Sequence, residues 1–578
     1  MFVAAAGFGV WLRWPAVHAG FYMDDSVQIA MLRGQFPAHR SMFDLFRFAD
    51  EARDGTALVD AGYDPWWTEP GFRVALFRPL SSLLFAFDYA AFGLDATRWH
   101  YHSILWSVAL VAAASLVFSR TVIGRALPLS ILLFALHESQ TAPFVWLANR
   151  STLVSAVFAF AGVFIHANAE RRRGARLVEA GAFLLALLGG EYGYGAIAYV
   201  VAYEVFEPRE RREKIRALLP ALVPAVLCIF GSALLGYGAR GSASYLSPFN
   251  DSGEFLRAIG SRVPALYGDL FLGRPAGDWS GRPLDRSAQE FMGLVGLAAF
   301  AWGARFAAEE LAPRERRAVH ALAFGSVLSA IPTASGIPED RLLVVASLGA
   351  CGVFATFVVE AWRRRPRFSS STTWALPNTI AALLILPLLK IGAFDAPRRM
   401  RSISEWFGVA APSLRRWAEN AEIPETRGAP PSVFLVAGAD FTTNANVPWL
   451  RALDDTPLPR TFFRLSGSPG VHEILRVAPN VLEMKMLMSD AEGVFAGGLY
   501  RSTNAKLRVG DVFRAAGVKV EVLTVDRMNP RRLRFTFERD VDSPDYVFVH
   551  PIHGHIERVR MPEIGEKLRL PIPEQPPM

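Results

Sequence analysis

Residues 21–26 of the sequence read Phe-Tyr-Met-Asp-Asp-Ser and directly follow the first apolar run of the chain, residues 2–20. The adjacent carboxylates Asp24 and Asp25 therefore stand where an apolar segment meets water. Ionisable groups at a membrane boundary are costly to misplace and often mark a functional site. A hydrophobic helix can also end in a charge simply because it has reached water, and charge position alone favours this plainer interpretation.

The composition is typical of a polytopic membrane protein with a sizeable soluble part. Of 578 residues, 52% are hydrophobic and 20% are charged, and the mean hydropathy is +0.23. The net charge of +7 is carried by arginine, because only six of the 61 basic residues are lysine. These arginines lie between apolar runs, so they indicate membrane topology and not a nucleic-acid partner. Cys228 and Cys351 lie inside apolar runs, as small core residues do.

The apolar runs predict about eleven membrane-spanning helices. No basic segment precedes residues 2–20, so we expect a first spanning helix there and not a cleaved signal peptide. Residues 22–98 form a long first loop, whose part 79–93 is amphipathic enough to lie at the membrane interface. The other ten spans are expected at residues 101–119, 126–138, 151–168, 177–190, 192–206, 217–236, 291–304, 318–332, 342–361 and 373–391.

Every second loop between these runs is rich in arginine. The basic loops are 120–125, 169–176, 207–216, 305–317 and 363–367, whereas 139–150 and 333–341 carry one arginine each. Basic loops tend to stay in the cytoplasm. The pattern therefore predicts a multi-pass membrane protein with a cytoplasmic N-terminus. The excess of arginine over lysine indicates a high-GC bacterium, so the expected location is the bacterial inner membrane. Asp24, Asp25, the loop 237–290 and everything after residue 395 are then expected on the outer side.

The chain is predicted to divide into a multi-pass membrane domain, 1–394, and a β-rich extracytoplasmic domain, 395–578. A helical linker opens the second domain and ends near a proline-rich stretch at 428–431. Beyond it, 433–436 is strand-like. The alternation in 518–525 and 533–537, around a turn at 528–530, predicts an antiparallel hairpin.

Several charged residues of the outer side could serve sugar transfer from a polyprenyl-phosphate carrier. Asp24 or Asp25 could be the base for the acceptor hydroxyl, and the other could orient the acceptor or hold a divalent metal ion. Arg78, Arg150 and Arg341 could neutralise the departing phosphate through their bidentate guanidinium forks. Each arginine could instead be an interface anchor.

Glu191 lies between glycines and between two short apolar runs, where a solvated surface charge is not expected. It could contact the acceptor or the aspartates, or it could belong to a tight turn between helices. His137 and Trp146, with Arg150, could form the rim of the same cavity, although a single histidine at a helix end is more often structural.

His550, His553 and His555 are close enough in sequence to bind zinc or copper. No cysteine or carboxylate completes a recognised spacing, so a polar turn between strands is the default interpretation.

Taken in order, several segments resemble the GT-C superfamily of membrane glycosyltransferases. The closest resemblance is to the transmembrane O-mannosyltransferases that carry tetratricopeptide repeats and to their bacterial relatives. The matching pieces are Asp24-Asp25, Phe77-Arg78-Pro79-Leu80, Phe92-Gly93-Leu94 with His100, His137 with Gln140-Thr141, Trp146, Arg150 and Leu153, Glu191, Glu339-Asp340-Arg341 and Ser347-Leu348-Gly349. They cover about residues 1–360.

The resemblance implies that the first outer loop supplies the catalytic aspartate and that the sugar arrives on dolichyl or undecaprenyl phosphate. It adds His100 and Gln140 to the expected substrate-binding residues. The sequence departs from the family pattern in having Glu138, Ala142, Gly190, Ser103 and Ser107 where proline, glutamate, lysine, asparagine and histidine are frequent. The β-rich tail replaces the repeats, so the acceptor need not be a protein and could be a lipid or a glycan.

The sequence thus predicts an inverting glycosyltransferase whose partners are a polyprenyl-phosphate sugar, membrane lipid and an acceptor hydroxyl. A transporter or flippase is the first alternative, although the long outer loop and the lack of inverted repeats argue against it. A non-catalytic relative that anchors the β-rich domain is the second.

Overall fold

The fold is described from a computed structural model. It describes residues 1–168, 174–280, 283–365, 376–424, 429–438, 441–487, 498–526 and 529–576. Most of the expected basic loop 169–176, residues 366–367 of the loop 363–367, Gly428 and Met528 lie outside these ranges. The chain forms two compact units, each built from segments that are distant in sequence.

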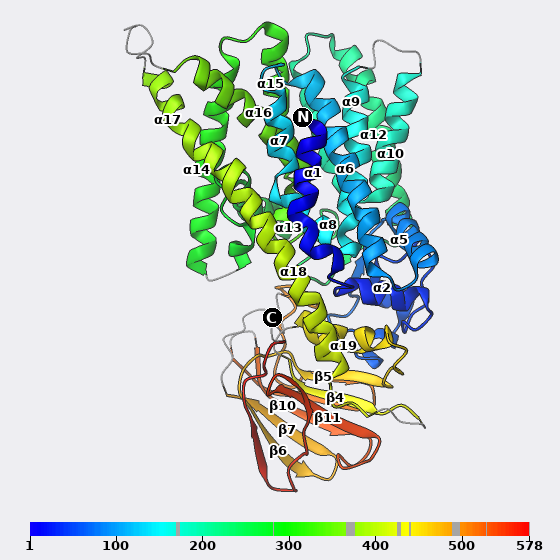
Figure 1. Cartoon of the computed structure of the whole chain (residues 1–578). Helices are drawn as coiled ribbons and strands as arrows, with labels where there is room; N and C mark the ends of the chain where they lie inside the picture. The colour runs from blue at the N-terminus through cyan, green and yellow to red at the C-terminus, as the bar shows by residue number, and fades with distance from the viewer. Residues whose placement is uncertain are drawn as a thin grey trace. The chain divides into compact units, whose positions relative to one another are not determined.

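The first unit, called here the helical unit, comprises Met1–Ala19, Phe77–Gly236 and Asp251–Gly408. Figure 1 shows its helices side by side, many of them roughly parallel. The helices are α1 (Phe2–Arg13), α5 (Pro79–Phe92), α6 (Ala96–Thr121), α7 (Leu127–Ala135), α8 (Thr141–Val145), α9 (Ser151–His166), α10 (Ala175–Gly189), α11 (Tyr192–Phe206), α12 (Arg211–Leu234), α13 (Ser252–Leu272), α14 (Pro283–Ala308), α15 (Pro313–Ser329), α16 (Val344–Arg363) and α17 (Leu376–Lys390), with the first half of α18 (Ala396–Glu419).

Each predicted apolar run corresponds to a helix. Seven segments of the described chain are long and apolar enough to cross a membrane: Ala96–Thr121, Leu147–His166, Arg211–Leu234, Leu284–Ala308, Pro313–Ser335, Asp340–Arg363 and Leu376–Glu419. The chain is therefore a multi-pass membrane protein. Helices α1, α7, α10 and α11 have 9 to 15 residues, which is short for a full crossing.

Helix α13 is the main helix that the apolar runs did not predict. It lies in the expected outer loop 237–290, and it carries the charged residues Glu254, Arg257, Arg262 and Asp269. These charges interrupt the apolar signal, although the helix packs closely against α14. Hydropathy alone therefore missed a helix whose buried side is formed by tertiary packing.

Small residues allow the central helices of this unit to approach closely. A Cβ atom at Gly325 of α15 would lie 2.3 Å from Cδ1 of Tyr199, which comes from α11. The Tyr199 hydroxyl accepts a hydrogen bond from the Gly349 amide of α16 (2.9 Å) and donates to the Val345 carbonyl (2.9 Å). This satisfied polar contact joins α11 to α16 where lipid offers no hydrogen-bond partner.

The second unit, called here the sheet unit, comprises Gly20–Leu76, Tyr237–Asn250 and Val409–Met578. The described part contains three sheets. A small antiparallel sheet joins β1 (Arg47–Asp50), β2 (Arg73–Ala75) and β3 (Gly238–Arg240). An antiparallel sheet has the order β13-β6-β7-β10-β9-β8, with β6 His472–Ala478, β7 Val481–Met486, β8 Val512–Ala515, β9 Val518–Asp526, β10 Asn529–Phe537 and β13 Lys567–Leu570.

The third sheet has the order β12-β11-β4-β5, and β4 (Ser432–Ala437) is parallel to both of its neighbours, β5 (Thr461–Ser466) and β11 (Tyr546–Ile552). Strand β12 (His555–Arg558) forms one edge, and α19 (Phe441–Ala452) connects β4 with β5. Every residue of β4 is buried. The predicted hairpin is confirmed, because β9 and β10 pair antiparallel from Val518↔Phe537 to Asn529↔Asp526.

The first loop folds together with the C-terminal sheets. The Trp66 indole donates to the Leu465 carbonyl (3.1 Å), and Arg464 donates to the Tyr63 carbonyl (2.6 Å). Arg501 Nε donates to the Trp67 carbonyl (2.8 Å). The predicted division at residue 394 assigned this loop to the membrane domain, whereas its buried tryptophans pack against strands more than 390 residues away.

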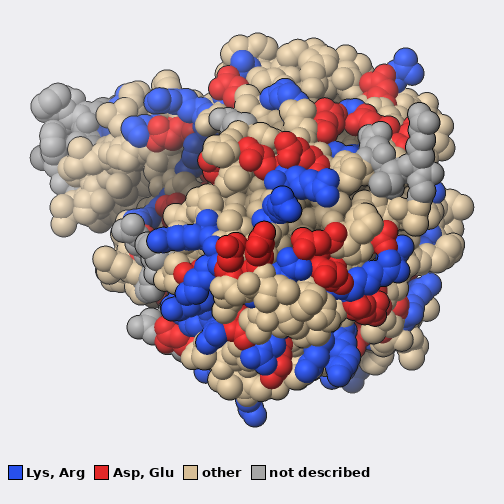
Figure 2. All heavy atoms as spheres, turned by 90° about the horizontal axis from the view of Figure 1, so that it is seen from below, with Lys and Arg blue, Asp and Glu red and all other residues tan. Residues whose placement is uncertain are grey.

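Charged side chains of both signs are interspersed on the face of the molecule seen in Figure 2. Among the ion pairs of the six-stranded sheet, Arg534 contacts Glu483 at 2.8 Å, and Arg476 contacts Asp540 and Asp542 at 2.8 Å each. Such a mixed surface suits contact with water.

Candidate functional site

The two neighbouring aspartates differ in their surroundings. Helix α2 (Asp24–Leu32) begins at Asp24, so both carboxylates occupy its first turn, where the helix dipole favours negative charge. Asp25 is fully buried, and its Oδ2 accepts a hydrogen bond from the Tyr22 amide (2.8 Å). Asp24 is partly exposed. Asp25 is therefore the buried carboxylate that stabilises the turn, and Asp24 is the more accessible one.

The backbone just before the pair is strained. Met23 has φ = +44° and ψ = −113°, a conformation that residues other than glycine rarely adopt. Such strain is kept where surrounding structure enforces it, and it concentrates at functional sites. Burial raises the pKa of the Tyr63 and Tyr500 hydroxyls, and the nearby charge of Asp24 adds to the shift. The half-buried Tyr63 and the buried Tyr500 of the sheet unit thus lie near Asp24.

In the helical unit, Arg78 and Glu191 form a bidentate ion pair. Arg78 Nε and Nη2 lie 2.7 Å from Glu191 Oε2 and Oε1, and Nη1 donates to Ser151 Oγ (3.1 Å). Burial raises the pKa of the Glu191 carboxyl, but the Arg78 guanidinium outweighs this effect and lowers the pKa below its usual value. The Glu191 side chain is 43% exposed and that of Arg78 is 12% exposed. Glu191 is thus an accessible charge as well as a turn residue.

The glycines around Glu191 explain how it is positioned. Ser81 of α5 donates to the Gly189 carbonyl (2.6 Å), and Ser155 of α9 donates to the Gly190 carbonyl (3.0 Å). A Cβ atom at Gly189 would lie 3.2 Å from the Ser155 backbone. Three helices therefore meet at the turn and hold Glu191 beside Arg78.

A second arginine is stacked on a predicted site residue in the same unit. The Arg341 guanidinium lies 4.9 Å from the centroid of the Trp146 ring, and its Nε lies 2.6 Å from Glu339 Oε2. The guanidinium groups of Arg341 and Arg78 are both close enough to the Tyr192 hydroxyl to interact with it electrostatically. We name the residues Arg78, Trp146, Glu191, Tyr192 and Arg341 the arginine cluster. It brings together four residues that the sequence singled out separately.

Arg150 has a different environment. Its Nη2 contacts Asp88, and its Nη1 donates to the Trp99 carbonyl (3.1 Å); the Arg150 and Asp88 side chains are 3% and 0% exposed. The other Asp88 oxygen contacts His102 Nδ1 (2.6 Å), whose Nε2 accepts from the Trp106 indole (3.0 Å). This chain requires the His102 tautomer protonated on Nδ1. The contacts are those of a buried structural network.

Of the remaining predicted residues of the helical unit, His100 and Gln140 are buried and His137 is half-buried. His100 is fully buried in α6, and Gln140 Nε2 donates to the Phe134 carbonyl (2.6 Å). His137 Nδ1 lies 3.0 Å from Ser139 Oγ, beside a cavity. Asp24 and Asp25 belong to the sheet unit, whereas the other predicted residues named here belong to the helical unit.

The three C-terminal histidines do not converge. His550 is buried and bonds the Pro571 carbonyl (3.1 Å), whereas the exposed His553 and the half-buried His555 both lie near Glu557 (2.8 Å and 3.5 Å). Within the described residues, no group of three or more His, Cys, Asp or Glu side chains could hold a metal ion. A divalent ion at Asp24 and Asp25 stays a prediction from the sequence.

Two ion pairs of the helical unit were not identified from the sequence. These are the pair of Arg150 with Asp88 and the pair of Glu138 with Arg399. Asp88 was not singled out, although an aspartate within an apolar helix is a signal of a buried pair. Glu138, noted only as a departure from the family pattern, contacts Arg399. That arginine is 261 residues away, so local sequence contained no sign of the pair.

No protein-family model and no curated protein matches the sequence. Among solved structures, the chain is similar to the oligosaccharyltransferase AglB from Archaeoglobus fulgidus in complex with an inhibitory peptide and a dolichol-phosphate. That match has 13% identity and a TM-score of 0.45, and it covers 81% of this chain. The chain spans 64% of the length of that protein.

The chain is also similar to ArnT from Cupriavidus metallidurans bound to undecaprenyl phosphate. This match has 12% identity and a TM-score of 0.39, and it covers 80% of this chain and 89% of that one. The first of these similar proteins is thus an oligosaccharyltransferase, and the second is bound to a polyprenyl phosphate.

Proposed function

We propose that the protein is a membrane glycosyltransferase that moves a sugar from a polyprenyl-phosphate carrier to an acceptor hydroxyl, with inversion at the anomeric carbon. The acceptor oxygen attacks the anomeric carbon and loses its proton to a carboxylate. The bond between the anomeric carbon and the phosphate oxygen breaks, and the carrier leaves as polyprenyl phosphate.

Asp24 is the proposed base, because it is the more accessible carboxylate of the pair. Asp25 is proposed as a positioning residue, because its carboxylate caps the turn that presents Asp24. General-base catalysis by a positioned carboxylate contributes about 10²- to 10⁴-fold to a rate.

The arginine cluster is the observation that carries the proposal. It places the guanidinium groups of Arg78 and Arg341 near the Tyr192 hydroxyl, and Arg78 is paired with the partly exposed carboxylate of Glu191. A phosphate that gains charge as the sugar leaves is stabilised by such fixed cations, and arginine binds it through two parallel hydrogen bonds. The stack on Trp146 restricts the Arg341 side chain before the substrate arrives.

Substituting Arg341→Ala is the test of this function. In a transfer assay with purified full-length protein and a panel of radiolabelled polyprenyl-phosphate sugars, we expect the donor KM to rise about 10- to 100-fold, the loss typical of a charge-assisted bond. Arg341→Lys should recover part of this loss, because it keeps the charge without the fork.

Arg98→Ala is the matched control, since Arg98 forms an exposed pair with Asp95. It should leave the donor KM unchanged. An Arg341→Ala protein with wild-type kinetics would contradict the assignment of the cluster, and a wild-type chain that transfers no sugar from any donor of the panel would contradict the proposed function.

We also propose that the sheet unit faces the outside of a bacterial inner membrane and that loop 305–317 faces the cytoplasm. The two native cysteines are buried, so single exposed cysteines can report orientation. In intact spheroplasts, a membrane-impermeant maleimide should label Ile564→Cys and should label Ala312→Cys only after lysis. The opposite pattern would exclude this topology.

A further inference from the structure

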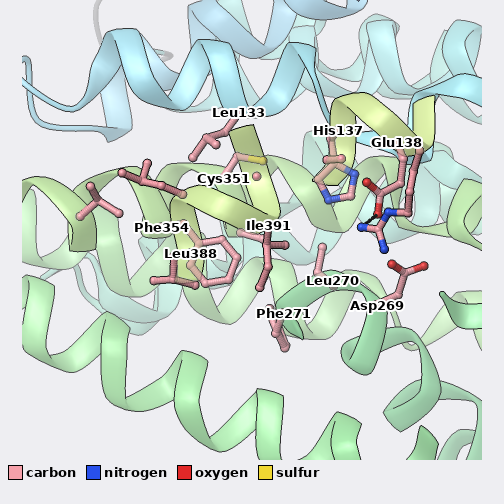
Figure 3. A pocket seen from close by; sticks show the side chains of 16 residues that line it. Leu133, His137, Glu138, Asp269, Leu270, Phe271, Cys351, Phe354, Leu388 and Ile391 are labelled. Carbon is pink, nitrogen blue, oxygen red and sulfur yellow. Dashed lines mark hydrogen bonds and ion pairs between the residues drawn. The ribbon is translucent and has the colours of Figure 1, made fainter. Parts of the chain in front are cut away.

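The helical unit contains an amphipathic cavity apart from the arginine cluster. It encloses about 50 Å³, several times the space that one water needs. Figure 3 shows polar His137, Glu138 and Asp269 gathered at one end, and apolar residues, among them Leu133, Phe354 and Leu388, toward the other.

The polar end contains more acceptors than the described residues satisfy. Glu138 Oε1 contacts Arg399, and Asp269 Oδ2 accepts from the Ala276 amide (3.0 Å). Glu138 Oε2 and Asp269 Oδ1 are buried without a hydrogen-bond partner among the described residues, and both residues are less than 5% exposed. A buried carboxylate oxygen left in this way is costly, so it indicates a donor that enters the cavity.

Asp269 is also badly placed for stability alone. It lies in the last turn of α13, which ends at Leu272, and a negative charge there opposes the helix dipole. Burial and the nearby carboxylates of Glu138 and Asp340 raise the pKa of the Asp269 carboxyl well above its usual range. The arrangement therefore costs free energy that a bound positive charge would offset.

The wall of the cavity contains an irregular helical turn. Ile391 and Gly392 line it, and they begin the π-helical turn Ile391–Asp395 between α17 and α18. Turns of this kind inside helices frequently occur at functional sites. The same segment brings Arg399 to Glu138 one helical turn later.

We propose that this cavity binds an amphiphile with an ammonium head group and a single apolar chain. The head group donates to Glu138 Oε2 and Asp269 Oδ1. The chain lies along the apolar residues of α7, α16 and α17. Charge selects the head group, because two carboxyl groups, those of Glu138 and Asp269, line the cavity beside one guanidinium, that of Arg399. A phosphate or carboxylate head group would be repelled. This site is independent of the proposed sugar transfer.

The test compares n-octylammonium, n-octanol and n-octanoate as ligands of the purified full-length protein in a nonionic detergent. Affinities come from the shift of the melting temperature with ligand concentration. Octylammonium should bind at least about tenfold more tightly than octanoate. Glu138→Gln and Asp269→Asn should each weaken octylammonium binding by about tenfold or more, because each removes one charged acceptor.

Two further variants keep the result decisive if Asp269→Asn does not fold. Ala350→Leu fills the cavity while both acids remain, and it should weaken binding of octylammonium. Glu405→Gln changes an acid of α18 that is 56% exposed, and it should leave binding at the wild-type value. Equal affinity for the three ligands, or wild-type affinity in folded Glu138→Gln, would overturn the proposal.

Discussion

Asp24→Asn is expected to slow sugar transfer by about 10²- to 10⁴-fold. The substitution is nearly isosteric, so the first turn of α2 and the donor KM should stay close to wild type. What is lost is the site that accepts the proton of the acceptor hydroxyl. The rate should be measured at saturating donor and acceptor, with the melting temperature as the test of folding.

Asp25→Asn is the matched control on the neighbouring residue. An asparagine oxygen can still accept from the Tyr22 amide, so the turn that presents Asp24 should persist and the rate should fall by no more than about tenfold. Asp24→Glu keeps a carboxylate and should retain part of the activity. Equal losses in the two asparagine variants would show that the roles of the aspartates are not separated as proposed, and a fully active Asp24→Asn protein would exclude Asp24 as the base.

Asp88→Ala is expected to destabilise the protein by about 3–5 kcal/mol, because it leaves the buried Arg150 guanidinium without its counter-charge. The same change removes the acceptor of His102 Nδ1. The free energy of unfolding, or the melting temperature in detergent, measures the loss. Glu405→Ala breaks an exposed pair with Arg401 and should cost less than about 1 kcal/mol.

The double variant Asp88→Ala/Arg150→Met separates lost charge balance from lost packing. It removes both buried charges, so it should be more stable than Asp88→Ala alone. Additive destabilisation by the two changes would contradict the structural network. A folded Arg150→Met protein with a greatly raised donor KM would restore Arg150 as a substrate-binding residue.

Local sequence patterns predicted the membrane-embedded helices and one hairpin of the C-terminal region. Apolar runs long enough to be membrane-embedded correspond to helices, and period-two alternation found the β9–β10 hairpin. Both signals depend on residues that are close in sequence. The missed helix α13 shows the limit, because four charged residues interrupt a segment that tertiary contacts nevertheless bury on one side.

The structure places the predicted site residues in two different kinds of environment. Arg78, Trp146, Glu191 and Arg341 come together in the arginine cluster, whereas Arg150 is buried against Asp88. In the sequence, residue type and position near an expected helix end indicate all five residues in the same way. An arginine at a helix end looks the same in sequence whether its partner is a buried aspartate, a ring or a substrate.

The sequence by itself determined a multi-pass helical protein with a β-rich C-terminal region, because hydropathy and strand alternation are properties of neighbouring residues. Only the tertiary structure decided that residues 20–76 and 237–250 fold with the C-terminal sheets. It also decided that Glu138 meets Arg399, and that Asp269 faces a cavity. These features join segments from tens to hundreds of residues apart, and such contacts arise from packing and charge pairing that no local period encodes.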